Sequence, residues 1–325
     1  LTPGLSKLWH SQASPPLILG CGSSYYAGLV TKYFMEELLG RTVRVEMASE
    51  FSHQTSLSAS GRLVIGLTQS GETADTLAAL ERMRKSGAGI LAVTNVSGSS
   101  VTRLAEQTIF MGARPELRVA ATKTFTPQLG SLFALTLSIA GLERRRRDQL
   151  ALALKELPAL VQRVLDDSED IEDAAQWLAG HRNVICIGRG AQYPVALEAA
   201  LKLKEVAYIH AEGCAAGELK HGPLALLNLE TPVIAVFGPD NNREAMLTTV
   251  REIKVRGAPV LAVTSGDDGC IKQLVNRVIT VPQADALLQP VVNAVALQLL
   301  AYYTARELGC SVDMPRHLAK SVTVE

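Results

Sequence analysis

The sequence has 325 residues, 47% hydrophobic and 20% charged, which is the composition of a globular chain with enough apolar material for a large core. Its length favours two domains. The charged side chains balance to a formal net charge of zero, which gives no reason to expect nucleic acid or an acidic membrane as a partner. The basic run at 143–148 indicates a solvated helix end or linker, with an anion-facing patch as the alternative.

The five cysteines are scattered singly, without a Cys-x-x-Cys pair or a histidine at metal-ligand spacing. This pattern predicts a reducing, cytoplasmic setting and argues against a metal site. No secretion signal is visible. The apolar stretch at 129–142 is too short to span a bilayer and carries hydroxyl groups, so we expect a buried helix there.

Two stretches of the first half recur in the second half, in the same order. Gly20-Cys21-Gly22 and the three residues after it align with Gly188-Arg189-Gly190 and their successors, at an offset of 168. "SGAGILAVTN" at 86–95 matches "RGAPVLAVTS" at 256–265, at an offset of 170. These matches predict a tandem duplication. We expect one half at 1–150 and the other at 151–325, with the join between about Arg146 and Asp173.

Short β-branched runs, at 17–19, 63–67, 90–93 and their counterparts, alternate with helical patterns of ten or more residues. This alternation predicts an α/β fold in which each half is a parallel sheet flanked by helices, a flavodoxin-like or Rossmann-like three-layer sandwich. In such sheets the ligand lies beyond the carboxyl ends of the strands. The loops at 21–24 and 68–73 are therefore the expected binding loops.

The first of these loops resembles a dinucleotide-binding fingerprint only in part. It lacks the third glycine, and no acidic residue is placed to hold a ribose, so we expect no nucleotide cofactor.

The two loops together favour a bound phosphate. Helix N-termini attract anions, and Ser24, Ser70 and Thr73 add hydroxyl donors. Gly22 and Gly71 allow a close backbone approach or a positive φ. The alternative is that the hydroxyl residues only cap a helix, but one cap needs one such residue and these loops have several. We therefore predict a phosphate-monoester site.

Glu198, Lys202 and Glu205 lie at i, i+4 and i+7 of one predicted helix that carries Pro194 at its start. A surface ladder of ion pairs is the commoner meaning of this spacing. The small and apolar neighbours favour instead a partly buried carboxylate, which suits proton transfer near neutral pH.

His221 precedes Gly222 and Pro223, which end a helix, and a loop histidine is a reasonable general acid or base. The remaining histidines are interpreted as structural: His10, His53, His181, His210 and His317. Lys320, close to the end of the sequence, is by itself an ordinary solvated charge.

Several of these stretches together resemble a known family. "CGSS" from Cys21, "TQSGETADT" from Thr68, "VAATKTFTPQL" from Val119 and "EGCAAGELKHGPLAL" from Glu212 are similar to the sugar isomerase (SIS) domains of phosphosugar-handling enzymes. With the ending "MPRHLAKSVTVE" from Met314, the chain is most similar to the isomerase portion of the glutamine–fructose-6-phosphate transaminase (glucosamine-6-phosphate synthase) family. The resemblance covers nearly the whole chain.

The resemblance implies two tandem SIS subdomains, the first of which holds a hexose 6-phosphate. The substrate-binding residues that it implies are Ser23, Ser24, Thr68, Gln69, Ser70, Thr73, Val119 and Ala319. The corresponding loop of the second half, at 237–245, has no serine or threonine, and its Asp240 would repel phosphate. We therefore expect one sugar site per chain.

The resemblance also implies the catalytic roles. Glu205 moves a proton between C1 and C2 of the sugar, with Lys202 as its electrostatic partner. His221 opens the sugar ring from a neighbouring subunit, which implies a homodimer. Lys320 forms a Schiff base with C2 of the ketose. No metal or organic cofactor is implied.

The expected function is a phosphosugar aminoisomerase that interconverts fructose 6-phosphate and glucosamine 6-phosphate, a step toward UDP-N-acetylglucosamine. No glutaminase segment is recognisable, so an excised isomerase domain and a stand-alone enzyme both remain open. The alternatives are a glucosamine-6-phosphate deaminase and a non-catalytic sugar-phosphate sensor. A sensor that regulates genes would need a DNA-binding segment, and none is recognisable.

Overall fold

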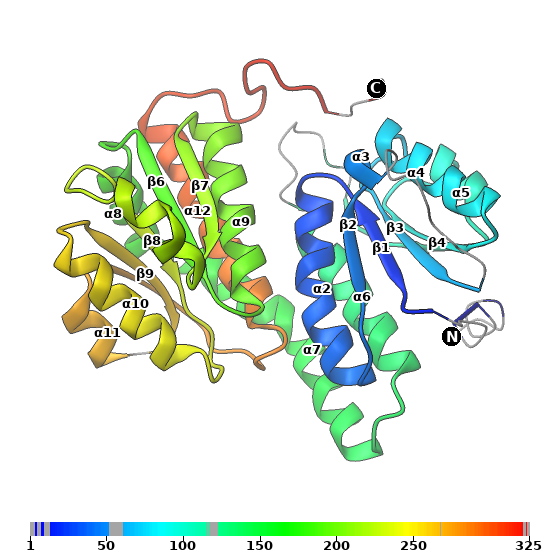
Figure 1. Cartoon of the computed structure of the whole chain (residues 1–325). Coiled ribbons are helices and arrows are strands. Elements are labelled where there is room, and N and C mark those ends of the chain that lie inside the picture. The colour runs from blue at the N-terminus through cyan, green and yellow to red at the C-terminus, as the bar shows by residue number, and fades with distance from the viewer. Residues whose placement is uncertain are drawn as a thin grey trace. The chain divides into compact units, whose positions relative to one another are not determined.

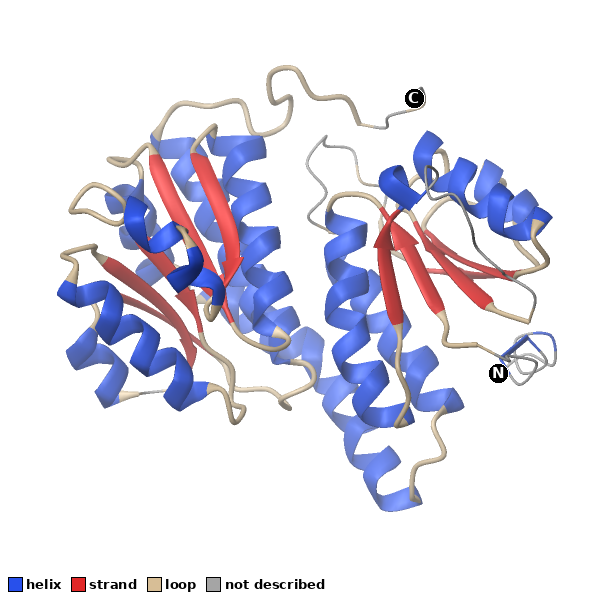
Figure 2. Ribbon diagram, in the orientation of Figure 1, coloured by secondary structure: helices blue, strands red, loops and turns tan. Residues whose placement is uncertain are grey.

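The computed structural model describes residues 4, 8–9, 14–51, 61–114, 116, 123–266, 268–320 and 323. The chain divides into two compact units: Leu1–Ala151 with Ala319–Glu325, and Leu152–Leu318. Each unit contains a five-stranded sheet with helices on both faces (Figure 1, Figure 2). No helix in the described part of the chain is long and apolar enough to cross a bilayer.

The first unit has a sheet in the order β2-β1-β3-β4-β5, and every neighbouring pair of strands is parallel. Helices α2 and α6 pack together on one face, while α3, α4 and α5 cover the other (Figure 1). The elements are β1 Leu17–Gly20, α2 Ser23–Leu39, β2 Arg44–Met47, α3 Ala48–Phe51, β3 Leu63–Leu67, α4 Ala74–Lys85, β4 Gly89–Thr94, α5 Ser100–Leu104, β5 Gln107–Phe110 and α6 Phe125–Ile139. Helix α7, Arg144–Asp166, crosses the boundary between the units.

The second unit has a parallel sheet in the order β7-β6-β8-β9-β10. Helices α8, α9 and α12 lie on one face, and α10 and α11 on the other (Figure 1). The elements are α8 Glu169–Leu178, β6 Asn183–Gly188, α9 Gln192–Lys202, a π-helical turn Leu203–Ala207, β7 His210–Ala215, 3-10 turns Glu218–His221 and Pro223–Leu226, β8 Val233–Val236, α10 Arg243–Val255, β9 Val260–Ser265, α11 Gly269–Leu274, β10 Arg277–Val281 and α12 Gln289–Glu307.

The two sheets have the same topology. When β6 to β10 are placed against β1 to β5 in chain order, both sheets have the order 2-1-3-4-5 of flavodoxin-like folds. The central strands β1, β3, β6 and β8 are almost entirely buried, as parallel strands covered on both faces must be. The predicted α/β fold with two tandem repeats is confirmed.

The core of the second unit contains a thiol that should make stability depend on alkaline pH. Burial within β6 raises the pKa of Cys186 to about 12, from an ordinary value of 9.0. The unfolded chain therefore releases this proton at a lower pH than the folded chain does. The contribution of the protonated thiol to stability is complete below pH 9 and is lost, by about 1.4 kcal/mol per pH unit, as the pH rises toward 12.

We expect Cys186→Ala to remove this slope. Urea unfolding measures the free energy of unfolding at about pH 8 and about pH 10.5. Between these pH values it should fall by about 2 kcal/mol less in the variant than in the unsubstituted chain. Cys270→Ala is the matched control because Cys270 is exposed on α11. Equal pH dependence in Cys186→Ala and the unsubstituted chain would contradict the prediction.

Candidate active site

The first unit places the two predicted binding loops side by side. Strands β1 and β3 are neighbours in the sheet, and their chains continue to helices on opposite faces, α2 and α4. This is the topological switch point, where doubly wound sheets open a crevice for a ligand. The loop at 21–22 with the first turn of α2 follows one of these strands, and the loop at 68–73 follows the other.

Hydrogen bonds fix the shape of the loop at 68–73. The hydroxyl of Thr68 accepts from the N–H of Gly71 at 3.2 Å, and the Gln69 carbonyl accepts from the N–H of Asn95 at 3.1 Å. Gly71 has a φ of +73°, and a Cβ there would lie 2.1 Å from Oγ of Ser99. Only glycine fits this turn, as expected from the sequence.

Helix capping does not explain the threonine at the end of this loop. Thr73 is the N-cap residue of α4, yet its side chain makes no capping hydrogen bond to the described first turn. Its hydroxyl lies 3.2 Å from that of Thr68 instead. The hydroxyl of Ser70 accepts from the N–H of Glu72 at 3.1 Å, so its own proton can be donated to another acceptor. The capping interpretation is therefore wrong for Thr73.

A hydrogen bond from a buried side chain determines how the Ser24 hydroxyl can bond. Gln128 of α6 is buried, and its amide Nε2 donates to Oγ of Ser24 at 2.9 Å. Because the serine oxygen accepts this bond, its own O–H has to donate elsewhere. Ser23 and Ser24 are the first two residues of α2, where the positive end of the helix dipole also favours an anion.

At the equivalent switch point of the second unit, the chain's own groups bond to one another. Gln192, the counterpart of Ser24, accepts from Nδ2 of Asn293 at 2.9 Å. The same Nδ2 donates to the Phe237 carbonyl at 2.8 Å. Asp240 accepts from both the backbone and the side chain of Asn242. These groups satisfy one another, so the switch point of the second unit offers few free donors to a phosphate.

The second unit brings the three predicted charged residues together, and they do not form a surface ladder. The side chains of Glu198 and Lys202 on α9 are each 1% exposed, and Nζ of Lys202 lies 3.6 Å from Oε1 of Glu198. Lys202 also donates to Oε2 of Glu205 in the π-helical turn. The Glu205 side chain is 22% exposed, so it is the member of the trio that solvent reaches most. The surface-ladder interpretation is wrong.

The electrostatics of this trio keep Lys202 charged. Burial disfavours its ammonium form, but the carboxylates of Glu198 and Glu205 outweigh burial and raise the pKa of Lys202 above its usual value. A cation fixed in this way beside Glu205 can hold that carboxylate in one orientation. Pro194 lies in the first turn of α9, although α9 begins two residues before it, at Gln192.

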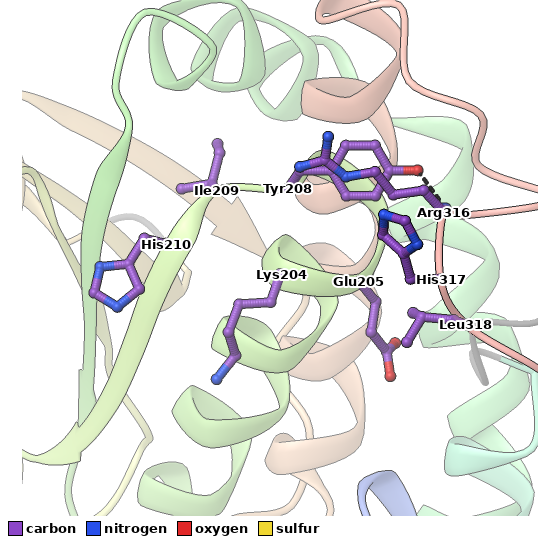
Figure 3. A pocket seen from close by; sticks show the side chains of 8 residues that line it. All are labelled: Lys204, Glu205, Tyr208, Ile209, His210, Arg316, His317 and Leu318. Atoms are coloured by element: carbon purple, nitrogen blue, oxygen red, sulfur yellow. Dashed lines mark hydrogen bonds between the residues drawn. The ribbon is translucent and has the colours of Figure 1, made fainter. Parts of the chain in front are cut away.

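A cavity of about 310 Å³ opens beside Glu205 (Figure 3). Its walls come from the end of the π-helical turn and the start of β7, and from the segment 316–318 near the end of the chain. His210 and His317, which we expected to be structural, both line it. His317 stands three residues before Lys320 in the family-like ending, and that position is the one sequence signal that could have identified it.

The other predicted site residues lie outside this cavity wall. His221 is exposed at the end of a 3-10 turn. Gly222 after it has a φ of +146°, so the helical turn ends there as predicted. Ala319 is exposed and Lys320 is partly buried, and both belong to the first unit. Val119 lies outside the described residues.

Known proteins resemble this chain along nearly its whole length. A glutamine–fructose-6-phosphate aminotransferase [isomerizing] of Methanosarcina acetivorans is 46% identical over 95% of the chain, and that of Aquifex aeolicus is 42% identical over 95%. The chain covers 50% and 52% of these proteins, so it spans about half the length of the curated relatives that it matches.

Solved structures agree with the fold. The C-terminal domain of glucosamine-fructose-6-phosphate aminotransferase from Francisella tularensis has a TM-score of 0.90 and 35% identity, covering 95% of this chain and 89% of that domain. A glucosamine-6-phosphate deaminase from Thermotoga maritima has a TM-score of 0.78 at 24% identity, with coverage of 98% and 95%, which supports the fold alone. The SIS domain model matches residues 11–138 and 178–307, one stretch in each repeat, and the chain therefore belongs to the SIS domain family.

Proposed function

We propose that this chain is a phosphosugar aminoisomerase that interconverts fructose 6-phosphate and glucosamine 6-phosphate. The observation that carries the proposal is the trio in the second unit, in which a buried lysine holds a carboxylate that faces a cavity. Proton transfer between neighbouring carbons needs one such oriented carboxylate that can gain and lose a proton. In this proposal the hydrogen-bonded loops at the switch point of the first unit supply the binding function.

In this proposal the first unit holds the sugar phosphate. The donors are the hydroxyls and first-turn N–H groups at the switch point, contributed by Ser23, Ser24, Thr68, Gln69, Ser70 and Thr73, with Val119 and Ala319 beside the sugar. Gln128 orients the Ser24 hydroxyl toward the anion. Neutral donors at a helix N-terminus suit a phosphate dianion.

The chemistry then falls to the second unit and the end of the chain. His221 opens the ring, and the neutral amine of Lys320 attacks the C2 carbonyl, so that a C=N bond forms and water leaves. Ammonia displaces the lysine amine from this imine. Glu205 takes a proton from C1 and returns it to C2, and loss of the C1 hydroxyl proton leaves the aldehyde of the amino sugar.

The proposal extends to the assembly and the direction of the reaction. His221 is exposed at the end of a 3-10 turn, which fits a residue that serves the site of a second copy in a homodimer. A cytoplasmic location fits five cysteines of which none forms a disulfide within the described chain. The names of the relatives at 42% to 46% identity favour the aminotransferase over the deaminase.

The test combines conversion and binding. The chain, supplied with fructose 6-phosphate and ammonium, should form glucosamine 6-phosphate. Ser70→Ala removes one hydrogen bond to a charged group, worth about 1.5–3 kcal/mol, and should weaken binding by about one to two orders of magnitude. Isothermal titration measures this affinity. Ser86→Ala is the control, since Ser86 lies at the opposite end of α4 and should leave the affinity unchanged. Unchanged affinity in Ser70→Ala would contradict the phosphate assignment.

A further inference from the structure

The end of the second unit is fastened to the turn that carries Glu205. Tyr208 follows Glu205 by three residues, and the guanidinium of Arg316 lies over its ring, 4.3 Å from the ring centroid. The backbone N–H of Arg316 also donates to the phenol oxygen of Tyr208 at 2.8 Å. Figure 3 shows the two side chains stacked on each other among the residues that line the cavity, with this hydrogen bond dashed. A cation over an aromatic face and a backbone hydrogen bond both act between the same two residues.

The backbone has an unusual conformation at Tyr208 and directly after Arg316. Among the described residues other than glycine, only Tyr208 and His317 have a positive φ, at 55° and 63°. For side chains with a Cβ this region is unfavourable, and such residues persist where surrounding contacts determine them. Tyr208 ends the π-helical turn, and His317 bends the chain directly after Arg316. One of the two residues with a positive φ therefore makes this contact, and the other directly follows Arg316.

Each residue of the Tyr208–Arg316 contact is close in sequence to a residue that the proposed function uses. Glu205 lies three residues before Tyr208, and Lys320 lies four residues after Arg316, so at most about 14 Å of extended chain separates Lys320 from the contact. Residues 316–319 are exposed, so burial contributes little to holding this segment in place. Such a segment depends on specific contacts for its position.

We infer that Tyr208 is a positioning residue that clamps the segment 316–318 and thereby places the amine of Lys320 for imine formation. The inference rests on the proposed function, in which Lys320 attacks C2 of fructose 6-phosphate. Tyr208 takes no part in the bond changes: the lysine amine forms the C–N bond, and the carbonyl oxygen leaves as water. The clamp reduces the number of conformations that the segment explores before this attack.

The test traps the imine. The full chain is incubated with fructose 6-phosphate without ammonia, and borohydride reduces the C=N bond to a stable secondary amine. Mass spectrometry of the digested protein then measures the sugar phosphate attached to Lys320. Tyr208→Leu removes both contacts and should lower the rate of labelling about tenfold, whereas Tyr208→Phe removes only the hydrogen bond and should lower it about threefold.

A second tyrosine provides a matched control. Tyr303 on α12 has the Arg306 guanidinium 4.9 Å from its ring centroid and shares a 3.0 Å hydrogen bond with Ser168, so Tyr303→Leu removes the same kinds of contact away from the segment. It should label like the unsubstituted chain. Arg316→Met keeps the ring of Tyr208 and its hydrogen bond but removes the cation, and it tests the clamp where Tyr208→Leu folds poorly. Affinity for fructose 6-phosphate should be the same in all variants.

The outcomes separate the clamp from the proposed function. Labelling that falls in the Tyr208 and Arg316 variants, at unchanged sugar affinity and unchanged labelling of Tyr303→Leu, supports the clamp. Full labelling of Tyr208→Leu and Arg316→Met overturns it and leaves the proposed function intact. An unsubstituted chain that binds the sugar but acquires no label on Lys320 overturns the proposed function, and the clamp with it.

Discussion

Glu205→Gln should lower the rate of isomerisation by about 10²–10⁴, the usual cost of removing a general base. Glutamine keeps the shape of the side chain and its capacity for hydrogen bonding, but it cannot take a proton from C1 and return it to C2. The Lys202 ammonium that now contacts Glu205 would still have Glu198 beside it, so α9 should stay folded. Affinity for the sugar phosphate should change little, because the proposed function assigns the phosphate to the first unit.

Solvent deuterium exchange into the sugar, followed by NMR, measures this step directly, and isothermal titration on the same sample measures binding. Glu244→Gln is the control, since Glu244 is an exposed carboxylate on α10, on the opposite face of the sheet from α9. Full exchange by Glu205→Gln would assign the base to another residue. An unsubstituted chain that binds the sugar and never exchanges its C1 or C2 protons would be a sensor.

The fold could be predicted because its determinants are local and repeated. Strands β1 and β3 are uninterrupted apolar runs, and a run buried on both faces belongs to a parallel sheet. The internal repeat then fixes the same plan for the second unit. The neighbouring position of the loops at 21–24 and 68–73 followed from topology, since the carboxyl ends of neighbouring parallel strands meet at one edge of the sheet. A positive φ was one of the two roles expected for Gly71, the other being a close backbone approach, and the structure shows the positive φ.

The features that could not be predicted depend on contacts between distant segments. The i, i+4, i+7 spacing of Glu198, Lys202 and Glu205 fits a surface helix and a buried one equally well, and only the packing of α12 and β7 against α9 decides between them. The support of Ser24 by Gln128 joins residues 104 positions apart. His317 lines the cavity and directly follows Arg316, which contacts Tyr208. No periodic pattern in the sequence indicates that contact.

The burial of the trio leads to the second large effect, which is on stability. Lys202→Met removes the ammonium that contacts two carboxylates, of which the Glu198 side chain is 1% exposed. A buried carboxylate that loses its cation typically costs about 3–5 kcal/mol, because the attraction is gone while the cost of desolvation stays. Urea unfolding near neutral pH should show a loss of this size. Lys204→Met is the control, since Lys204 is exposed, and should change stability by about 0.5 kcal/mol or less.

Two further measurements identify the cause of this loss. Protonation of the Glu198 carboxyl removes the buried charge, so the destabilisation by Lys202→Met should be smaller at about pH 4 than at about pH 8. Replacing both partners with apolar side chains of similar size, as in Glu198→Leu with Lys202→Met, removes the charge at every pH, and such replacements of buried ion pairs are often neutral or stabilising. The double variant should therefore be more stable than Lys202→Met alone. A double variant that is less stable than the single one would contradict the assignment of the loss to the uncompensated charge of Glu198.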